Sequence, residues 1–494
     1  MLRNSLKINS QLAFIILSTV LLVLRLFAIK VNNLELYADE AQYWVWAQHP
    51  AFGYYSKPPL VAWLIASSTK LFGNCEFAVR IFSPLLHFIT GFIVYLIGKN
   101  FGNKVAFLSG CVYITTPAIF VSSFIMSTDP VLMLLWALSF YFFLSALNSN
   151  KFIYWILCGV ASGLGMLAKY NMLFFLLSVF LYMFYISKSF RFVYSKNFIA
   201  ALISALIIFS PNLLWNINNM FVSFMHTADL VQGDPSSKFS FKKLAEFFFA
   251  QFGVFGIITF SFLNVSAYLW WRGKLNKNYN ILCFFSIPIL FFMLIIAFIS
   301  RAHANWAAPI YITSSVLVVL TAKDLNKLNL IKFSIVLHLV IGLGIMFYQP
   351  LCQKLGMEIA PKYDIYKRLR GGEELGRNIL RIKGNYDIAI IAVDTRKDLS
   401  LINYYTKQSK VEIVKWNPTK RISDYYALTT DANKFIGQDM LVVFQYSDEE
   451  RRRSDEKYLR KYAEEVKFIE VLNKSTAHSH PKYQIFYLKK FKGY

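Results

Sequence analysis

The first long apolar segment of the chain, residues 11–30, reads QLAFIILSTVLLVLRLFAIK. Apart from Arg25 and Lys30 it carries no charge, and about 20 apolar residues are enough to cross the hydrocarbon core of a bilayer. Segments of the same kind recur up to residue 349. We expect about eleven spans, with thirteen as the upper limit, at 11–30, 80–98, 104–122, 130–147, 152–168, 171–187, 198–215, 248–271, 280–300, 306–322 and 331–349.

Charge divides the chain into two regions with different solvents. The whole sequence is 56% hydrophobic and only 16% charged, whereas soluble domains carry about a quarter charged residues. Residues 1–349 hold only 9 of the 28 acidic residues, while residues 350–494 hold the other 19 together with 28 of the 52 basic residues. We therefore predict a membrane-embedded domain over 1–349 and a water-soluble domain over 350–494.

The soluble region alternates two kinds of segment. Strand-like runs occur at 386–393, 440–446, 466–472 and 483–488, with helix-like stretches between them, notably at 449–466. Such alternation favours a small α/β domain. The predicted fold class is thus an all-α polytopic membrane protein that carries a C-terminal soluble α/β domain.

The net charge of +24 does not point to nucleic acid, because the basic residues of the membrane region lie in short loops between apolar runs. Topology selection places basic loops in the cytoplasm. With Arg3 and Lys7 inside, every second loop is short and basic, and an odd number of spans puts the C-terminal domain outside, in the periplasm of a bacterial inner membrane. The expected non-protein partner is then the lipid bilayer.

Acidic residues of the membrane region gather on the opposite side. Only Asp324 falls inside by this topology; the external ones are Glu35, Asp39, Glu40, Glu76, Asp129, Asp229, Asp234 and Glu246. An external site that uses carboxylates is the economical explanation. Cys75 and Cys352 also fall outside, so a disulfide between them stays open as an alternative to free thiols.

The densest group of polar residues lies in the external loop 31–79, whose aromatic residues favour short helices at the membrane interface. Asp39 and Glu40 are adjacent, so their side chains diverge, and one can face a site while the other supports it. Lys57 precedes Pro58 and Pro59, which hold it in extended geometry. A lipid phosphate is its natural partner, although a simple interfacial anchor has the same pattern.

Four other segments carry polar groups at the external face. Asp129 follows Ser127 and Thr128 at the start of a span, where a helix-terminal acid is the alternative reading. Residues 301–309 combine Arg301, His303 and Asn305, and a polar turn between helices is the alternative there. The third segment, 211–216, reads PNLLWN, and Lys169 lies between two short spans.

These motifs in order resemble the protein O-mannosyltransferase-like superfamily of membrane glycosyltransferases, and most of all its bacterial branch related to lipid A aminoarabinose transferase. The matching segments are 39–44 (DEAQYW), 54–60 (YYSKPPL), 127–130 (STDP), 168–171 (AKYN), 211–216 (PNLLWN) and 303–309 (HANWAAP). Gln42 and Ser56 depart from that branch, where an arginine and an acid are expected. The first departure weakens a claim of the same sugar, and the second weakens the transfer of a metal site.

The resemblance implies a GT-C fold and the transfer of one sugar from a polyprenyl-phosphate donor to an envelope acceptor, with inversion expected for a direct displacement. Carried over by position, Asp39 and Asp129 match the external acids of the family, and Lys57 matches the lysine at the carrier phosphate. With the neighbouring Glu40 and with Arg301 as a second cation near the membrane face, the expected catalytic residues are Asp39, Asp129 and Glu40, and the expected donor-phosphate ligands are Lys57 and Arg301. The expected substrate contacts are Tyr43, Tyr55, His303, Asn305 and Lys169. The acceptor stays open among lipid A, lipopolysaccharide, another glycan and protein.

Other functions remain possible at this point. A transporter or flippase of a lipid-linked sugar is the runner-up, although transporters favour charges at the membrane midplane and repeated halves. A scaffold protein is a third option. The sequence does not require a cofactor. A divalent cation stays open, because five polar residues could gather around one although they lack the local spacing of a metal motif: Asp39, Glu40, His49, Asp129 and His303.

Overall fold

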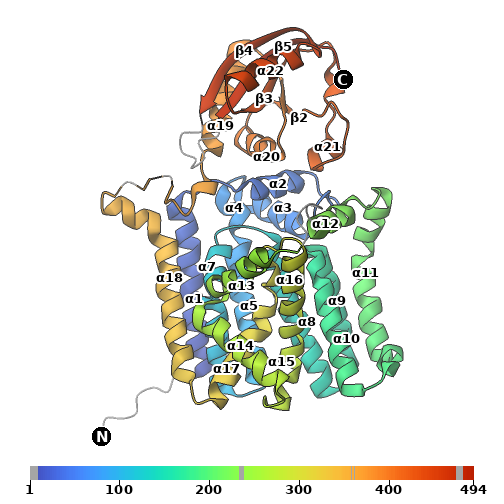
Figure 1. Cartoon of the computed structure of the whole chain (residues 1–494), viewed down its shortest axis with the longest axis vertical. Coiled ribbons are helices and arrows are strands. Elements are labelled where there is room, and N and C mark those ends of the chain that lie inside the picture. Colours follow the sequence, from blue (N-terminus) through green and yellow to red (C-terminus); the bar gives the residue numbers. More distant parts are fainter. Residues whose placement is uncertain (1–8, 233–238, 358, 361, 474–481) are drawn as a thin grey trace. The chain divides into compact units, whose positions relative to one another are not determined.

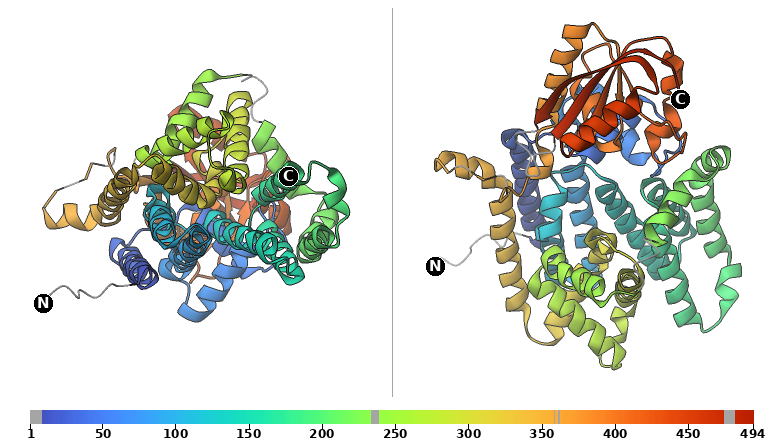
Figure 2. Two further views of the ribbon diagram at one scale, coloured as in Figure 1. Left: turned by 90° about the horizontal axis from the view of Figure 1, so that it is seen from below. Right: turned by 45° about the horizontal axis from the view of Figure 1, so that its top comes forward.

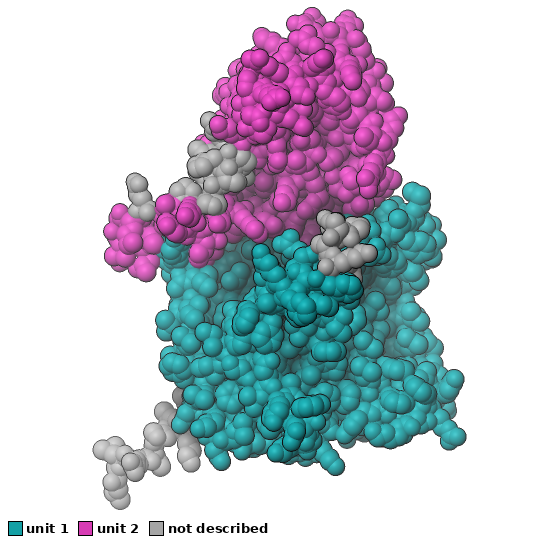
Figure 3. All heavy atoms as spheres, in the orientation of Figure 1, with its two compact units in different colours: residues 1–32, 57–61, 80–350 teal, residues 33–56, 62–79, 351–494 magenta. Residues whose placement is uncertain are grey.

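A computed structural model describes residues 9–232, 239–357, 359–360, 362–473 and 482–494, and Figure 1 shows its helices and strands. Arg3, Lys7 and Asp234, which entered the topology prediction, lie outside these residues. The chain forms two compact units. Unit 1 consists of residues 1–32, 57–61 and 80–350, and unit 2 of residues 33–56, 62–79 and 351–494 (Figure 3).

Unit 1 is a helical bundle. Among the described residues, seven helical segments are long and apolar enough to cross a membrane. They are Ser10–Asn32 (α1), Glu76–Lys99 (α4 Glu76–Arg80 and α5 Phe82–Lys99), Thr128–Ser149 (α8), Tyr170–Ser187 (η1 Tyr170–Met172 and α10 Leu173–Ser187), Lys196–Asn218 (α11), Lys277–Ile299 (η3 Lys277–Tyr279, α15 Asn280–Phe284 and α16 Ile287–Ile299) and Leu328–Lys354 (α18).

The remaining helices of unit 1 are shorter. Seven of them overlap four of the predicted spans, and the other two lie in the connections. Their bounds are Asn103–Thr115 (α6), Pro117–Ser122 (α7), Phe152–Ala168 (α9), Phe190–Tyr194 (η2), Val222–Gln232 (α12), Phe241–Phe255 (α13), Ile257–Trp271 (α14), Ala304–Ala307 (η4) and Ile310–Asp324 (α17).

The segment predicted as one span at 248–271 is instead two helices, α13 and α14, which meet at an angle of 118° (light green in Figures 1 and 2). Gly256 separates them with φ of +95°, a backbone conformation that only glycine adopts without strain. The apolar pattern continues through this residue, so hydropathy alone did not reveal the break. The bent pair counts as at most one further span.

Close helix packing in unit 1 depends on small residues. Helix α9 packs against both α8 and α11, and these helices run side by side in Figure 1. Gly159 and Gly163 of α9 face the backbone at Ala201 and Ala205 of α11 so closely that a methyl group at either glycine would collide with it. Van der Waals contact through small residues is the main force that joins helices in lipid.

Unit 2 combines helices of the first external loop with an α/β domain. Its elements are Ala38–Gln48 (α2), Leu60–Phe72 (α3, which begins in unit 1), Lys367–Leu369 (η5), Gly372–Tyr386 (α19), Ile390–Val393 (β1), Arg396–Tyr405 (α20), Glu412–Lys415 (β2), Tyr425–Thr429 (α21), Ala432–Phe435 (η6), Met440–Tyr446 (β3), Glu449–Leu459 (α22), Ala463–Asn473 (β4) and Lys482–Phe491 (β5).

The strands form one mixed sheet in the order β2-β1-β3-β5-β4. Strand β1 pairs in parallel with β2 and β3, and Ile390 is level with Glu412 on one side and Met440 on the other. Strand β5 pairs antiparallel with β3 and β4. All four residues of β1 are buried, as expected for a central parallel strand covered on both faces.

The predicted α/β character of this region is confirmed, with differences in detail. Strand β2 was not predicted, because it has only four residues and charged residues at both ends. Tyr386 belongs to α19 rather than to a strand, and the helix predicted to reach residue 466 ends at Leu459, where β4 soon begins. The pairing register of β4 with β5 shifts between Phe468 and Glu470.

Candidate functional site

In unit 1, Asp129 is held by side chains from two other segments. Its Oδ1 lies 2.5 Å from the ammonium of Lys169, and its Oδ2 accepts a hydrogen bond of 2.6 Å from Asn305. The side chains of Asp129 and Lys169 are only 15% and 9% exposed. Ser127 caps helix α8 and Asp129 stands in its first turn, so of the alternative reading the first-turn acid is confirmed and the cap is not.

Other basic side chains interact with Asp129 and with the nearby His303. Lys57 interacts electrostatically with Asp129. Partial burial lowers the pKa of His303, and the charges of Arg301, Lys169 and Lys57 lower it further, so this imidazole is neutral at pH 7. Basic side chains therefore predominate among Lys169, Lys57, Arg301 and Asp129, which suits an anionic ligand such as a phosphate.

The turn that presents Lys169 is anchored by a buried polar network. The Tyr170 hydroxyl donates to Asn212 Oδ1 at 3.1 Å and lies 2.7 Å from Ser223 Oγ. Ser223 in turn donates to Asn216, whose side chain is fully buried. The polar residues of 211–216 and of 168–171, quoted above as separate motifs, therefore form one structural network behind Lys169.

A second network holds the turn that presents Asn305. The side chain of Gln251, in α13, is buried; it donates to the carbonyl of Ala304 at 3.3 Å and accepts a hydrogen bond from the Tyr311 hydroxyl. Helix α13 thus carries, five residues before Gly256, the amide that fixes η4. Sequence reasoning missed Gln251 and Tyr311, because both lie inside apolar runs and no motif marks them.

In unit 2, Asp39 and Glu40 point to different surroundings. Glu40 is fully buried and accepts a hydrogen bond of 2.9 Å from the backbone of Tyr37, which holds the first turn of α2. Asp39 is 40% exposed, and its Oδ1 lies 3.0 Å from the guanidinium of Arg396. Arg396 also donates to the buried side chain of Gln42.

Sequence reasoning missed Arg396, which follows strand β1 and begins α20. A signal existed: polar residues directly after a buried parallel strand often form the functional edge of an α/β sheet. The residues in question, Asp394, Thr395 and Arg396, stand there, but nothing in the linear sequence connects them to the first loop.

The remaining predicted contacts differ in exposure. Tyr43 is buried and its ring lies 5.1 Å from that of Trp46, whereas Tyr55 is half-buried.

Arg25 is buried within unit 1, where it donates to the Ile114 carbonyl at 2.5 Å and lies 5.0 Å from the ring of Phe120. It therefore packs against neighbouring helices instead of extending to the membrane surface.

Within the part of the chain that the structure describes, no group of three or more histidine, cysteine and acidic side chains is arranged to hold a metal ion. Asp39 and Asp129 belong to different units. All five cysteines are free thiols, including Cys75 and Cys352.

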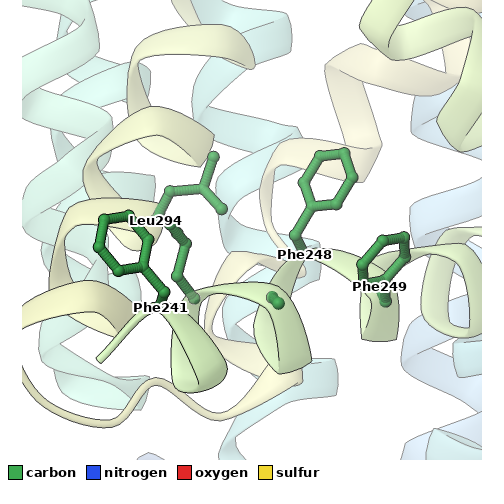
Figure 4. Close-up of a pocket in the computed structure, with 6 residues that line it drawn as sticks. Phe241, Phe248, Phe249 and Leu294 are labelled. Carbon is green, nitrogen blue, oxygen red and sulfur yellow. The ribbon is translucent and has the colours of Figure 1, made fainter.

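Unit 1 also contains an apolar cavity of about 440 Å³ between α13 and α16. Its lining side chains are Phe241, Leu244, Ala245, Phe248, Phe249 and Leu294 (Figure 4). Both helices that line the cavity pack against η4, which carries Asn305. The cavity and the charged cluster are therefore built from adjoining segments.

Known proteins resemble this chain in sequence. The family model of dolichyl-phosphate-mannose-protein mannosyltransferases matches residues 56–215. The lipid A galacturonosyltransferase RgtD of Rhizobium johnstonii is 28% identical over 408 residues, which cover 81% of this chain and 84% of that protein. An undecaprenyl phosphate-alpha-4-amino-4-deoxy-L-arabinose arabinosyl transferase of Pseudomonas savastanoi pv. phaseolicola is 26% identical over 131 residues, 26% of this chain and 25% of that protein.

Solved structures share the fold. The crystal structure of ArnT from Cupriavidus metallidurans in the apo state matches with a TM-score of 0.61 and 12% identity, and covers 96% of this chain and 98% of that one. The same protein bound to undecaprenyl phosphate gives a TM-score of 0.60 at 11% identity, with the same coverage. The family match, the relatives and the shared fold together support a GT-C membrane glycosyltransferase related to the enzymes that modify lipid A.

Proposed function

We propose that this protein transfers a single sugar from a polyprenyl-phosphate donor to a lipid A-type acceptor. The observation that carries the proposal is the cluster around Asp129, in which Lys169 and Lys57 act on one shielded carboxylate and Arg301 acts on His303. A cluster in which basic side chains predominate is suited to a substrate that arrives with a phosphate and leaves it behind.

Lys57 and Arg301 bind the donor phosphate in this proposal. Cleavage of the sugar–phosphate bond places additional negative charge on the leaving phosphate, and fixed cations stabilise that charge in the transition state. Lys169 is committed to Asp129 at 2.5 Å. It therefore orients the carboxylate, while the other two cations face the ligand. His303, neutral at pH 7, can donate a hydrogen bond without adding charge.

The apolar cavity next to η4 accepts part of the polyprenyl chain. Its volume of about 440 Å³ lies within the usual range of ligand pockets, and all six lining residues are apolar. Its side chains come from α13 and α16, and Arg301 follows α16 directly. A phosphate on Arg301 would place the first isoprene units beside this lining.

Asp39 acts as general base if the acceptor group is a hydroxyl, a role worth about 10²–10⁴-fold in rate. If the acceptor group is itself a phosphate, no base is required, and Asp39 orients the acceptor. Its 40% exposure leaves it open to a substrate, whereas the buried Glu40 supports the helix on which it stands.

The relatives suggest which sugar to test first. The galacturonosyltransferase aligns with 81% of this chain, whereas the aminoarabinose transferase aligns with only 26% of it, and Gln42 departs from the aminoarabinose pattern. A uronic acid is therefore the first donor to test and 4-amino-4-deoxyarabinose the second. The N-terminus is proposed to be cytoplasmic and the C-terminal domain periplasmic.

The direct test is product formation. Purified protein in nanodiscs is incubated with lipid A and undecaprenyl-phosphate-linked uronic acid, aminoarabinose or hexose, and products are weighed by mass spectrometry. We expect one sugar increment on lipid A. Lys57→Ala and Arg301→Ala should each raise the KM for the donor more than tenfold, while the exposed Lys327→Ala should not change it.

The competing function and the topology have their own readouts. If transfer is absent with every donor but the protein moves labelled polyprenyl-phosphate sugar across liposomes, a flippase is the correct assignment.

A C-terminal alkaline phosphatase fusion should be active in cells and a C-terminal green fluorescent protein fusion dark, because only the former matures in the periplasm. The reverse pattern contradicts the proposed orientation.

A further inference from the structure

The ion pair between Asp39 and Arg396 joins parts of the sequence that are 357 residues apart. Arg396 is the first residue of α20, and two residues separate it from the end of strand β1. Thr395 caps that helix by accepting a hydrogen bond of 3.2 Å from the backbone of Asp398. The Arg396 side chain is therefore attached to a well-defined helix N-terminus that follows the carboxyl end of strand β1.

Helix α2 and the residues just before it also contact α20 at other points. The backbone of Leu36 donates to the Tyr405 hydroxyl at 2.8 Å, and the Trp44 ring meets that of Tyr404 edge-on at 5.1 Å. Because Tyr404 and Tyr405 end α20 and Arg396 begins it, both ends of α20 contact the segment that carries Asp39. The distance between Asp39 and Arg396 is thereby held by rigid elements and not by two flexible side chains alone.

Gln42 explains why a distant arginine is needed. It stands one helical turn after Asp39, where the resemblance leads us to expect an arginine, and an amide cannot supply a positive charge. The Gln42 side chain is 1% exposed, and its oxygen accepts a hydrogen bond from Arg396. A guanidinium thus reaches the same face of α2, but it comes from the C-terminal domain.

We propose that Arg396 is the positioning residue for Asp39, and that it replaces the cation missing at position 42. This inference rests on the proposed function of Asp39. Arg396 holds one carboxylate oxygen at 3.0 Å and leaves the other for the substrate. Because both side chains remain one-third or more exposed, the pair is accessible to an acceptor. The C-terminal domain is then part of the catalytic apparatus.

The test is a set of matched variants assayed for sugar transfer with the full-length protein. Arg396→Ala should lower kcat about 10- to 100-fold and leave the KM for the donor within twofold, because a carboxylate displaced by about 1 Å loses rate without losing phosphate binding. Arg396→Lys should retain more activity than Arg396→Ala. Arg377→Ala, which removes a 75%-exposed arginine of the same domain, should behave like the wild type.

Two further variants separate positioning from folding. The double variant Asp39→Asn with Arg396→Ala should be no slower than Asp39→Asn alone, since both changes remove the same interaction. Adding Gln42→Arg to Arg396→Ala should restore at least fivefold in kcat at an unchanged melting temperature.

An unchanged kcat in Arg396→Ala, or fully multiplicative losses in the double variant, would overturn the inference. Failure of Gln42→Arg to restore activity in a protein with a normal melting temperature would do so too. Absence of transfer in the wild type, or full activity of Asp39→Asn, would instead contradict the proposed function on which the inference rests.

Discussion

Asp129 in unit 1 and Asp39 in unit 2 are both carboxylates paired with a cation, but they are held in opposite ways. Asp129 is 15% exposed and Lys169 only 9%, whereas Asp39 and Arg396 are 40% and 33% exposed. A shielded ion pair whose partner is removed leaves a charge that water cannot reach, at a cost of about 3–5 kcal/mol, whereas exposed pairs contribute only about 0–1 kcal/mol. We therefore expect the first pair to affect both folding and the proposed chemistry, and the second chiefly the proposed chemistry.

Replacement of Lys169 by Met should produce the largest loss of stability, because it leaves the Asp129 carboxylate shielded and without its cation. We expect a loss of about 3–5 kcal/mol, seen as a lower melting temperature in detergent. The double variant with Asp129→Asn should recover most of that stability but no activity. Arg396→Ala should cost less than about 1 kcal/mol; equal losses at the two pairs would contradict the comparison.

Gly256→Ala should destabilise the bent pair that supports the unit 1 cluster. Alanine at φ of +95° is strained, and its Cβ would collide with the His338 ring, so we expect a cost of about 3 kcal/mol. Gly253→Ala is the matched control, because no atom lies within 4 Å of the added methyl group. Similar melting temperatures for the two variants would show that the bend does not depend on Gly256.

Asp394 should make the stability of unit 2 depend on pH. Burial, together with the nearby charge of Asp398, raises the pKa of Asp394 to about 6. A group with a raised pKa in the folded state contributes stability below its unfolded pKa of about 3.9, and this contribution is lost as pH rises through about 6. Asp394→Asn should therefore raise stability above pH 6 by up to about 3 kcal/mol and have little effect at pH 4.

The measurement is a thermal melt of wild type and Asp394→Asn between pH 4 and pH 8. The difference in melting temperature between the two proteins should grow across pH 4–6 and then level off. Asp439→Asn is a useful contrast, because hydrogen bonds from Tyr487 and the backbone of Lys490 lower the pKa of Asp439, so the difference should have the opposite sign there. A pH-independent difference for Asp394→Asn would contradict the prediction.

Tyr170→Phe should reduce stability less than Lys169→Met or Gly256→Ala. The change removes the hydroxyl that contacts Asn212 and Ser223 behind Lys169, at a cost of about 1–2 kcal/mol. Because the network positions Lys169, we expect kcat to fall more than that stability loss suggests. Tyr95→Phe, in the same bundle but with a single long contact of 3.4 Å to Ser10, is the control. Equal kcat values for the two variants would show that Tyr170 does not help to position Lys169.

Sequence patterns alone revealed apolar membrane helices, the α/β domain and the residues of the Asp129 cluster, but not the number of spans: against eleven predicted, seven or at most eight helices among the described residues are long and apolar enough. Spans are readable because a helix that crosses the bilayer needs about 20 predominantly apolar residues. Lys169, Asn305 and Lys57 were found because each stands in a short polar motif between apolar runs. The same reasoning failed at Gly256, where the apolar pattern continues through a sharp bend.

Only the tertiary structure decided which polar groups meet. Asn305 reaches Asp129 across 176 residues and Arg396 reaches Asp39 across 357, and neither pairing leaves a periodic trace in the sequence. Gln251 and Tyr311 are hidden in apolar runs for the same reason, since their hydrogen bonds are made across helices. Local patterns report on solvent and on neighbours three or four residues away, whereas the site depends on which helix ends and strand ends packing brings together.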